Sequence, residues 1–205
     1  MLYFVRHGET DWNREPVHCQ GWADVGLNET GRRQAREQGS RLRGAGIQVI
    51  VSSHLRRAQE TAEIIHHELG DELPLRLDER LAETRRGTWE KRSFADIKEQ
   101  EPEAWRHYRE HPETFRFPGG ESLAEQQARV LAAVRDVADE DGVALLVTHG
   151  GSIRLVRAFI DGSCIQSFHR TSVPNCDLLT VPCHDLAARI SAFLPAAGAT
   201  PKETP

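Results

Sequence analysis

Short apolar runs alternate with helical patterns along this chain, and that alternation limits the fold more than any other feature. Strand-like runs rich in β-formers occupy 2–6, 48–52 and 143–147. The runs at 48–52 and 143–147 are each followed by a segment whose apolar residues recur at intervals of three and four, which is typical of a helix packed on a sheet, and the run at 2–6 is followed by a helix signal that starts at Asn28. Such alternation favours a parallel sheet covered on both faces. The sequence therefore predicts a three-layer α/β/α fold with a mainly parallel sheet.

Caps and periodicity assign the other elements. We expect a helix over about 29–43 capped by Asn28, a helix over 55–69, a short strand over 73–78, a long helix from about 121, a helix over 153–160, and closing strands over 177–181 and 188–193. Residues 80–120 are polar and weakly periodic, which indicates a small insertion of loops and short helices over one edge of the sheet. A single domain then spans 1–194, and the Pro-, Ala- and Gly-rich end, 195–205, is expected to be disordered.

Composition and charge limit the classes of partner that we expect. The 205 residues, 39% apolar and 28% charged, suit one domain with its own core. A net charge of -5 argues against nucleic acid. No apolar run, 143–147 included, is longer than five residues, which is too short to cross a bilayer, and Arg6 interrupts the N-terminal run before a secretory segment forms. We therefore expect a cytoplasmic protein with no membrane partner, and leave its oligomeric state open, with a homodimer as one option.

The histidines and cysteines give no metal-site pattern. Four cysteines lie at 19, 164, 176 and 183 without a Cys-x-x-Cys pair, which is consistent with reduced thiols. His107 and His111 are four residues apart, but Pro112 follows at once and no His-Glu-x-x-His order is present. We expect a surface helix there and no metal.

Polar groups follow three of the predicted strands. Strand 2–6 ends in Arg6 and His7, strand 48–52 leads to Arg57, and strand 143–147 leads to His149. If these strands are parallel, their carboxyl ends lie on one edge of the sheet, where ligands bind in open α/β folds. Two helix N-termini would add N–H groups and positive dipole ends. Arginine, histidine and helix N-termini together suit a phosphate.

The chain resembles the histidine phosphatase superfamily, the phosphoglycerate mutase-like enzymes, over about 1–194. The resemblance is carried in order by Arg-His-Gly-Glu-Thr at 6–10 with Trp12 and Asn13, Gln20-Gly21-Trp22, Ser-Ser-His-Leu-Arg-Arg-Ala at 52–58, Leu-Ala-Glu at 81–83 with Gly87, Trp89 and Glu90, Pro-Gly-Gly-Glu-Ser at 118–122 and Val-Thr-His-Gly at 147–150. Any one of these motifs is weak alone, because each residue has an ordinary structural explanation. Their shared order is specific.

The resemblance implies a chemical role for each motif. His7 would attack phosphorus as a neutral imidazole and carry a phosphohistidine. Arg6, Arg57 and His149 would stabilise the phosphoryl oxygens, and Glu83 would act as general acid and then base. The resemblance also implies a phosphate-binding set, with no cofactor or metal required: Asn13, Gln20, Gly21, Gly150 and Arg86.

Three departures from the family pattern stand out. His54 occupies a position that is usually Pro, and it could lie near the pocket or start its helix less rigidly. The loop between Asn13 and Gly21 is about one residue longer than is common. Residues 85–92 are basic, with Arg85, Arg86, Lys91 and Arg92, and form either a solvated loop or a rim that attracts acidic substrates.

The family holds both phosphatases and mutases. The Trp89-Glu90 pair and the Gly-Gly-Glu-Ser run resemble the small phosphatase branch, whereas cofactor-dependent mutases share an Arg-His-Tyr-Gly stretch that is absent here. We therefore expect a metal-independent phosphomonoesterase acting on a small phosphorylated metabolite. The alternatives are a phosphoglycerate mutase and a catalytically silent domain that binds a phospho-ligand.

Overall fold

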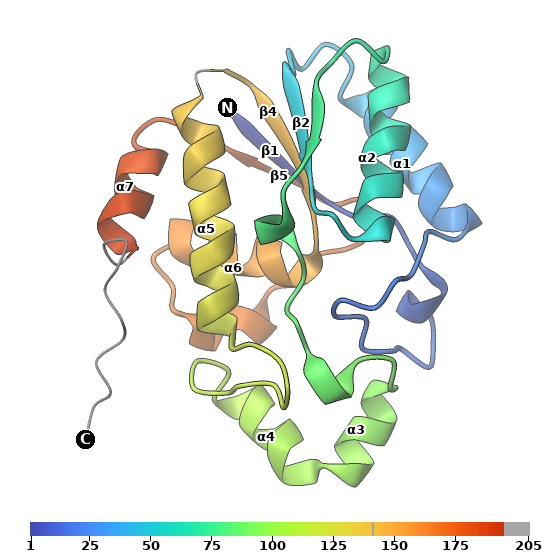
Figure 1. Cartoon of the computed structure of the whole chain (residues 1–205), viewed down its shortest axis with the longest axis vertical. Coiled ribbons are helices and arrows are strands. Elements are labelled where there is room, and N and C mark those ends of the chain that lie inside the picture. Colours follow the sequence, from blue (N-terminus) through green and yellow to red (C-terminus); the bar gives the residue numbers. More distant parts are fainter. Residues whose placement is uncertain (141, 195–205) are drawn as a thin grey trace.

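A five-stranded sheet lies between two layers of helices in the computed structural model, which describes residues 1–140 and 142–194 (Figure 1). The spatial order is β3-β2-β4-β1-β5. The strands are β1 (Leu2–Arg6), β2 (Val49–Ser52), β3 (Leu75–Leu77), β4 (Ala144–Thr148) and β5 (Leu178–Val181). The first four are mutually parallel, and β5 pairs antiparallel with β1. The predicted mainly parallel α/β/α fold is confirmed.

The central strands are apolar on both faces because each face is covered by helices. Phe4 and Leu146 face the layer that contains α5 (Leu123–Asp139), α6 (Gly150–Ile160) and α7 (Leu186–Phe193). Val5 and Leu145 face the opposite layer, where α1 (Glu29–Arg41) and α2 (Arg56–Leu69) pack. These alternating contacts fix the register of the strands, because a shift of one residue would exchange the two faces.

Local capping groups set the helix starts that the sequence predicted. The Asn28 side chain accepts a hydrogen bond from the Gly31 amide at the start of α1, at 2.9 Å. Ser122 and Glu125 form a reciprocal capping box at the start of α5. Such caps satisfy amides that have no partner within the helix.

The expected closing strand over 188–193 is wrong. This segment belongs to the helix α7, whose buried residues Leu186 and Ile190 are one turn apart and pack in the core cluster that includes α5. Ala187, Ala188 and Arg189 are good helix formers, and their contribution outweighs the strand-like alternation around Ile190 and Phe193.

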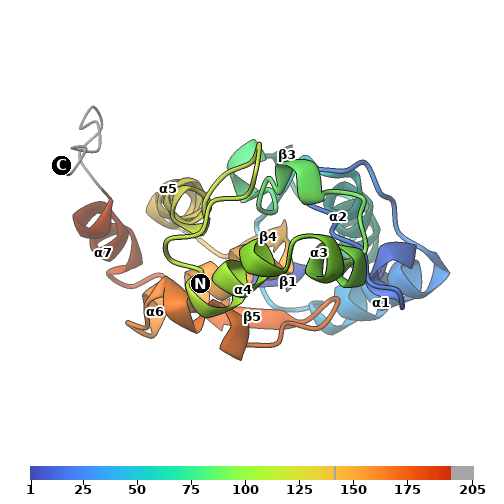
Figure 2. The same cartoon turned by 90° about the horizontal axis from the view of Figure 1, so that it is seen from below.

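The insertion, residues 80–120, covers the carboxyl ends of the parallel strands. It contains α3 (Phe94–Gln100) and α4 (Pro102–Glu110), joined to the sheet by the short 3-10 helices Glu79–Leu81 and Gly87–Trp89. Seen from below, α3 and α4 lie across the end of the sheet (Figure 2). An aromatic cluster packs the insertion together with the 3-10 helix over 165–170. Its buried aromatic members are Trp89, Tyr108, Phe115 and Phe117 from the insertion and Phe168 from the 3-10 helix.

Two further 3-10 helices, Asp11–Asn13 and Ile165–Arg170, lie in loops that follow β1 and α6. None of the described helices is both long and apolar enough to span a bilayer. The expectation for 195–205 lies outside the described residues.

Candidate active site

A cavity of about 320 Å³ lies between the carboxyl ends of the strands and the insertion. Nine of the ten site residues expected from sequence line it, and His149 adjoins it with its ring 5.2 Å from that of His7. The lining residues that carry the argument below are Arg6, His7, Asn13, Gln20, Gly21, Arg57, Glu83, Arg86, Phe94, Trp105, Tyr108, Arg109, Gly150, Gly151, Arg154 and His169.

His7 directly follows β1, and its side chain is 3% exposed. Its Nδ1 lies 2.7 Å from the Gly8 carbonyl oxygen, so Nδ1 carries the proton and Nε2 keeps its lone pair. Burial first, and then the nearby Arg57, Arg6 and His149, hold the pKa of His7 well below its usual range. The imidazole is therefore neutral, which is the form a nucleophile requires.

Gly8 allows this turn to pack closely. A side chain at Gly8 would overlap the backbone of Gly31 in the first turn of α1. The Gly8 amide donates to Thr61 Oγ1 at 3.0 Å, and the Thr61 hydroxyl donates to the Arg57 carbonyl at 2.7 Å. The His7 segment is thereby tied to the helix turn that supplies Arg57.

Arg6 and Arg57 are cations that backbone carbonyls orient. Arg6 donates to the Val173 carbonyl at 2.6 Å, and Arg57 donates to the carbonyls of Gly21 and Ala23 at 2.7 and 3.2 Å. Within the described part of the chain, neither guanidinium has a carboxylate within 4.0 Å. Burial lowers the pKa of Arg57 to about 10, so it remains charged at neutral pH.

His149 is the N-cap of α6, and Ser53 positions its ring through a 2.8 Å contact between Ser53 Oγ and Nε2. Its Nδ1 is buried and has no hydrogen-bond partner among the described residues, and the same is true of Arg6 Nε and Arg57 Nε. Buried polar groups normally find a partner, and leaving one without is costly. These three groups therefore indicate a site for an anion with several acceptor oxygens.

Asn13 also offers a hydrogen-bond donor at the cavity wall. Its Oδ1 accepts from the Thr10 amide at 3.0 Å, from the Thr10 hydroxyl at 3.2 Å and from Asn175 Nδ2 at 3.3 Å. This leaves the Asn13 amide nitrogen as a donor for the cavity. Asn175, which also donates to the His7 carbonyl at 3.0 Å, gave no signal in the sequence.

Glu83 is a carboxylate in the same cavity, held by two backbone amides. Its Oε1 accepts from the Thr84 amide at 2.9 Å, and its Oε2 accepts from the Gly151 amide at 3.1 Å in the first turn of α6. A side chain at Gly151 would overlap this carboxylate. Burial pushes the pKa of Glu83 upward, but Arg86, the two amides and Arg57 together hold it at about 2. In the ligand-free protein Glu83 is therefore ionised.

Both expected glycines, Gly21 and Gly150, line the cavity, and the Gly21 carbonyl also accepts the hydrogen bond from Arg57. Gln20 lines the cavity with a buried Oε1 that has no partner among the described residues. An unpaired acceptor of this kind suits a hydroxyl or protonated oxygen of a ligand.

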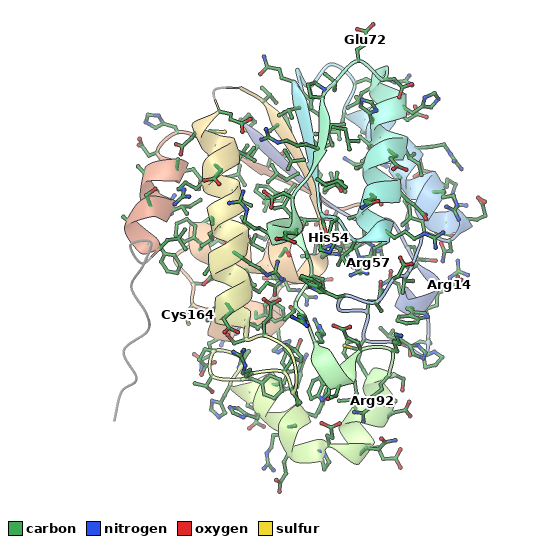
Figure 3. All side chains as sticks on the ribbon, in the orientation of Figure 1. Arg14, His54, Arg57, Glu72, Arg92 and Cys164 are labelled. Atoms are coloured by element: carbon green, nitrogen blue, oxygen red, sulfur yellow. The ribbon has the colours of Figure 1, made fainter. Side chains whose placement is uncertain are left out.

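The basic stretch 85–92 reaches the cavity only through Arg86. Arg85 stacks over Trp22 with its guanidinium 5.7 Å from the ring centre, and Arg92 pairs with Glu101. Figure 3 shows Arg92 beside α3, well below Arg57 and His54. Of the four basic residues in this stretch, Arg86 is the one in the cavity lining, and Arg85, Lys91 and Arg92 are not among the lining residues.

His54, His107 on α4 and His111 at its C-cap lie outside the cavity lining. The His54 ring packs edge-on against Trp22, with ring centres 5.1 Å apart. His107 contacts the Thr114 hydroxyl through Nε2 at 2.9 Å. Across residues 1–140 and 142–194, no group of three or more histidines, cysteines and carboxylates is placed to hold a metal ion.

Sequence reasoning missed several residues at the outer part of the cavity, namely Phe94, Trp105, Tyr108, Arg109, Arg154 and His169. Arg154 left a usable signal, because it is four residues after Gly150 and so shares its face of α6. The others come from the insertion and from the 3-10 helix over 165–170, whose placement depends on tertiary packing.

Comparison with known proteins shows which family this sequence resembles. The family model described as histidine phosphatase superfamily (branch 1) matches residues 2–193. A probable phosphoglycerate mutase, GpmB, from Salmonella paratyphi B is 37% identical over 181 residues, which cover 87% of this chain and 82% of the relative.

Solved structures give the same result. Bacillus stearothermophilus YhfR superposes with a TM-score of 0.81 at 33% identity, covering 88% of this chain and 91% of that one. A mycobacterial glucosyl-3-phosphoglycerate phosphatase in complex with VO3 gives 0.78 at 32% identity, with coverage of 86% and 90%. A mutant phosphoserine phosphatase from Entamoeba histolytica in complex with phosphoserine gives 0.73 at 25%, with coverage of 86% and 87%. This chain therefore belongs to the histidine phosphatase superfamily, branch 1.

Proposed function

We propose that this protein is a phosphomonoesterase that hydrolyses a small phosphorylated metabolite through a phosphohistidine at His7. The observation that carries the proposal is the set of buried nitrogens that have no partner among the described residues, Arg6 Nε, Arg57 Nε and His149 Nδ1, around a neutral imidazole and a carboxylate. A phosphoryl group has the oxygens to pair with these nitrogens and is open to attack by the imidazole.

In the first step, the lone pair of His7 Nε2 forms a bond to phosphorus while the bond from phosphorus to the ester oxygen breaks. Arg6 and Arg57 compensate the negative charge on the equatorial oxygens during transfer. Because carbonyls already hold these guanidiniums in place, little reorganisation is needed when the substrate enters.

Glu83 would supply a proton to the leaving oxygen. With a pKa of about 2 in the ligand-free protein, Glu83 is ionised, and it can act as an acid only after bound substrate has raised its pKa. A bound phosphate places negative charge nearby, which raises the pKa of the carboxyl, and the monoanionic form of a monoester carries a proton to share. The proton on Glu83 then passes to the alkoxide, leaving Glu83 ionised.

In the second step, Glu83 accepts a proton from water as the water oxygen attacks phosphorus. The phosphorus–nitrogen bond breaks, phosphate leaves and His7 returns to its neutral form. The carboxylate thus acts in both directions, as an acid and then as a base. The positive charge comes from arginines, so we propose no metal for either step.

A phosphoglycerate mutase is the second candidate, favoured by the 37% identity to a protein named probable phosphoglycerate mutase. The phosphatases among the structural neighbours, at 32% and 25% identity, favour hydrolysis. A silent phospho-ligand binding domain is the third candidate, and the presence of both a neutral His7 and Glu83 argues against it. We also propose that residues 1–194 form a single domain and that residues 80–120 cover its active site. The proposed location is the cytoplasm.

Trapping and product analysis test these candidates together. The protein should release phosphate from an aryl phosphate and, after quenching in base, carry a base-stable, acid-labile phosphate that the His7→Ala variant lacks. A mutase would instead transfer the phosphoryl group between phosphoglycerate isomers faster than it releases phosphate. Phosphate binding without either reaction would support the third candidate, a catalytically silent domain.

A further inference from the structure

We propose that the outer part of the cavity is a subsite for a second acidic group, built by Arg86, Arg109 and Arg154. The preferred substrate would then be a phosphomonoester that carries a carboxylate or a second phosphate. This inference rests on the proposed function, because it assumes that the first phosphoryl group lies against Arg6 and Arg57.

Arg86 is a buried cation for which the described residues supply no carboxylate within 4.0 Å. It is 7% exposed, and its guanidinium lies over the rings of Phe94, Tyr108 and Phe117, 5.1 to 5.8 Å from their centres. The Tyr108 hydroxyl accepts a long hydrogen bond of 3.4 Å from it. Ring faces attract a cation, but they do not use its N–H donors. Several donors therefore remain for a ligand.

Arg154 enters the same space from α6. Its Nε donates to the Thr171 carbonyl at 2.8 Å, and its guanidinium lies 5.3 Å from the centre of the Phe168 ring. These contacts fix the stem and the plane of the guanidinium, as they do for Arg86. Arg154 lines the cavity, and no described carboxylate lies within 4.0 Å of its guanidinium.

Arg109 approaches from α4, and a neutral histidine orients it. His169 Nε2 lies 2.9 Å from the Tyr108 carbonyl oxygen and therefore carries the proton. His169 Nδ1 is then an acceptor, and Arg109 Nη1 donates to it at 3.1 Å. Burial, together with Arg109, Arg154 and Arg86, lowers the pKa of His169 to about 4, which keeps the ring neutral. The neutral ring thus positions the Arg109 cation, which has no carboxylate within 4.0 Å among the described residues.

The charge of the cavity separates this subsite from the phosphoryl site. Five arginines line the cavity, whereas Glu83 is the single carboxylate among its described lining residues. When a phosphoryl dianion pairs with Arg6 and Arg57, Glu83 is the one negative charge that the described lining residues supply for Arg86, Arg109 and Arg154. Arg86 is buried, Arg154 is half-buried and Arg109 is exposed, so a substrate with an uncharged tail would leave at least the buried Arg86 cation without a partner, which is unfavourable. An acidic tail would pair with them.

The test uses four matched three-carbon substrates: propyl phosphate, 3-aminopropyl phosphate, 3-phosphonooxypropanoate and propane-1,3-diyl bisphosphate. Phosphate release gives kcat/KM for each. The native protein should favour the two acidic tails over propyl phosphate by about tenfold or more, the equivalent of one charge-assisted hydrogen bond, and should disfavour the amine. Comparing kcat/KM for the carboxylate-tailed and the phosphate-tailed substrate distinguishes a carboxylate subsite from a phosphate subsite.

Variants then locate the preference. Arg109→Gln and Arg154→Gln should each reduce the ratio of acidic-tail to propyl kcat/KM by about tenfold. Arg106→Gln, one turn earlier on α4, and Arg157→Gln, one turn later on α6, remove the same charge outside this cavity and should keep the native ratio. Arg86 is left intact because its removal would disturb the aromatic cluster.

The outcomes separate the two proposals. Equal turnover of propyl phosphate and the acidic-tail substrates would overturn the subsite and leave the phosphatase intact. The same would follow if Arg106→Gln changed the ratio as much as Arg109→Gln, because the effect would then be general charge attraction. No phosphate release from any of the four, or from an aryl phosphate, would overturn the proposed function itself.

Discussion

Gln126 Nε2, on α5, lies 3.2 Å from Oε1 of Glu83 and donates a hydrogen bond to it. The same nitrogen lies 3.1 Å from Ser152 Oγ, and Gln126 Oε1 accepts from the Thr84 hydroxyl at 2.5 Å. Gln126 is fully buried, so its side chain has no competing contact with solvent. One amide thus fixes the position of the candidate acid relative to α5 and α6.

Replacing Gln126 by Leu should impair the acid function more than phosphoryl binding. We expect kcat for an alkyl phosphate to fall by roughly tenfold or more, because a misplaced acid transfers its proton poorly. An aryl phosphate, whose leaving group needs little protonation, should be affected less. The matched control is Gln127→Leu, which removes a neighbouring buried amide that bonds to the Leu155 carbonyl instead. Equal losses on both substrates would reduce Gln126 to a structural role.

Removing the acid itself should give the same pattern with larger amplitude. In Glu83→Gln, we expect the rate on an alkyl phosphate to fall by about 10² to 10⁴-fold, and the rate on an aryl phosphate to fall much less. Burst kinetics with the aryl substrate would show whether hydrolysis of the phosphohistidine has become limiting. If alkyl and aryl substrates lose rate in the same proportion, Glu83 is not the proton donor.

The inner half of the site could be predicted from sequence because topology determines it. Arg6, His7 and His149 adjoin β1 and β4, and parallel strands must bring their carboxyl ends together. The outer half depends on side-chain direction within an irregular insertion. Arg85 and Arg86 are adjacent, yet one stacks on Trp22 and the other enters the cavity.

Two further features escaped prediction for the same reason. The α7 segment has too few residues for period two and period 3.6 to be told apart, and contact with α5 decides in favour of the helix. Arg109 becomes a site residue only because α4 folds over the sheet and His169 receives it there. Neither contact has a local signal in the chain.

Activity should survive removal of divalent metals. Arg6 and Arg57 supply the positive charge next to the phosphoryl site, and the described residues include no carboxylate cluster of the kind that holds magnesium. After dialysis against a chelator, phosphate release from an aryl phosphate should remain at the untreated rate. Loss of activity that one added metal restores would show that the arginines are insufficient.

Stability should fall as pH falls below 7, because His7 and His149 resist protonation in the folded protein. Burial and the nearby arginines hold both pKa values well below the ordinary value of about 6.5, whereas the unfolded chain takes up protons near that value. The unfolded state therefore binds more protons at acidic pH, and the free energy of unfolding decreases as pH is lowered. Between pH 7.5 and 5.5, each histidine should contribute a loss of about 1.4 kcal/mol.

Urea unfolding at the two pH values, in buffer without phosphate, measures this loss. His7→Gln and His149→Gln should each reduce the difference in unfolding free energy between pH 7.5 and 5.5 by about 1.4 kcal/mol, whatever they do to stability at pH 7.5. His184→Gln, at an exposed position just before α7, should keep the native difference. If the His7 variant is as sensitive to acid as the native protein, the His7 imidazole is not held neutral by its surroundings, and it would need another source of activation as a nucleophile.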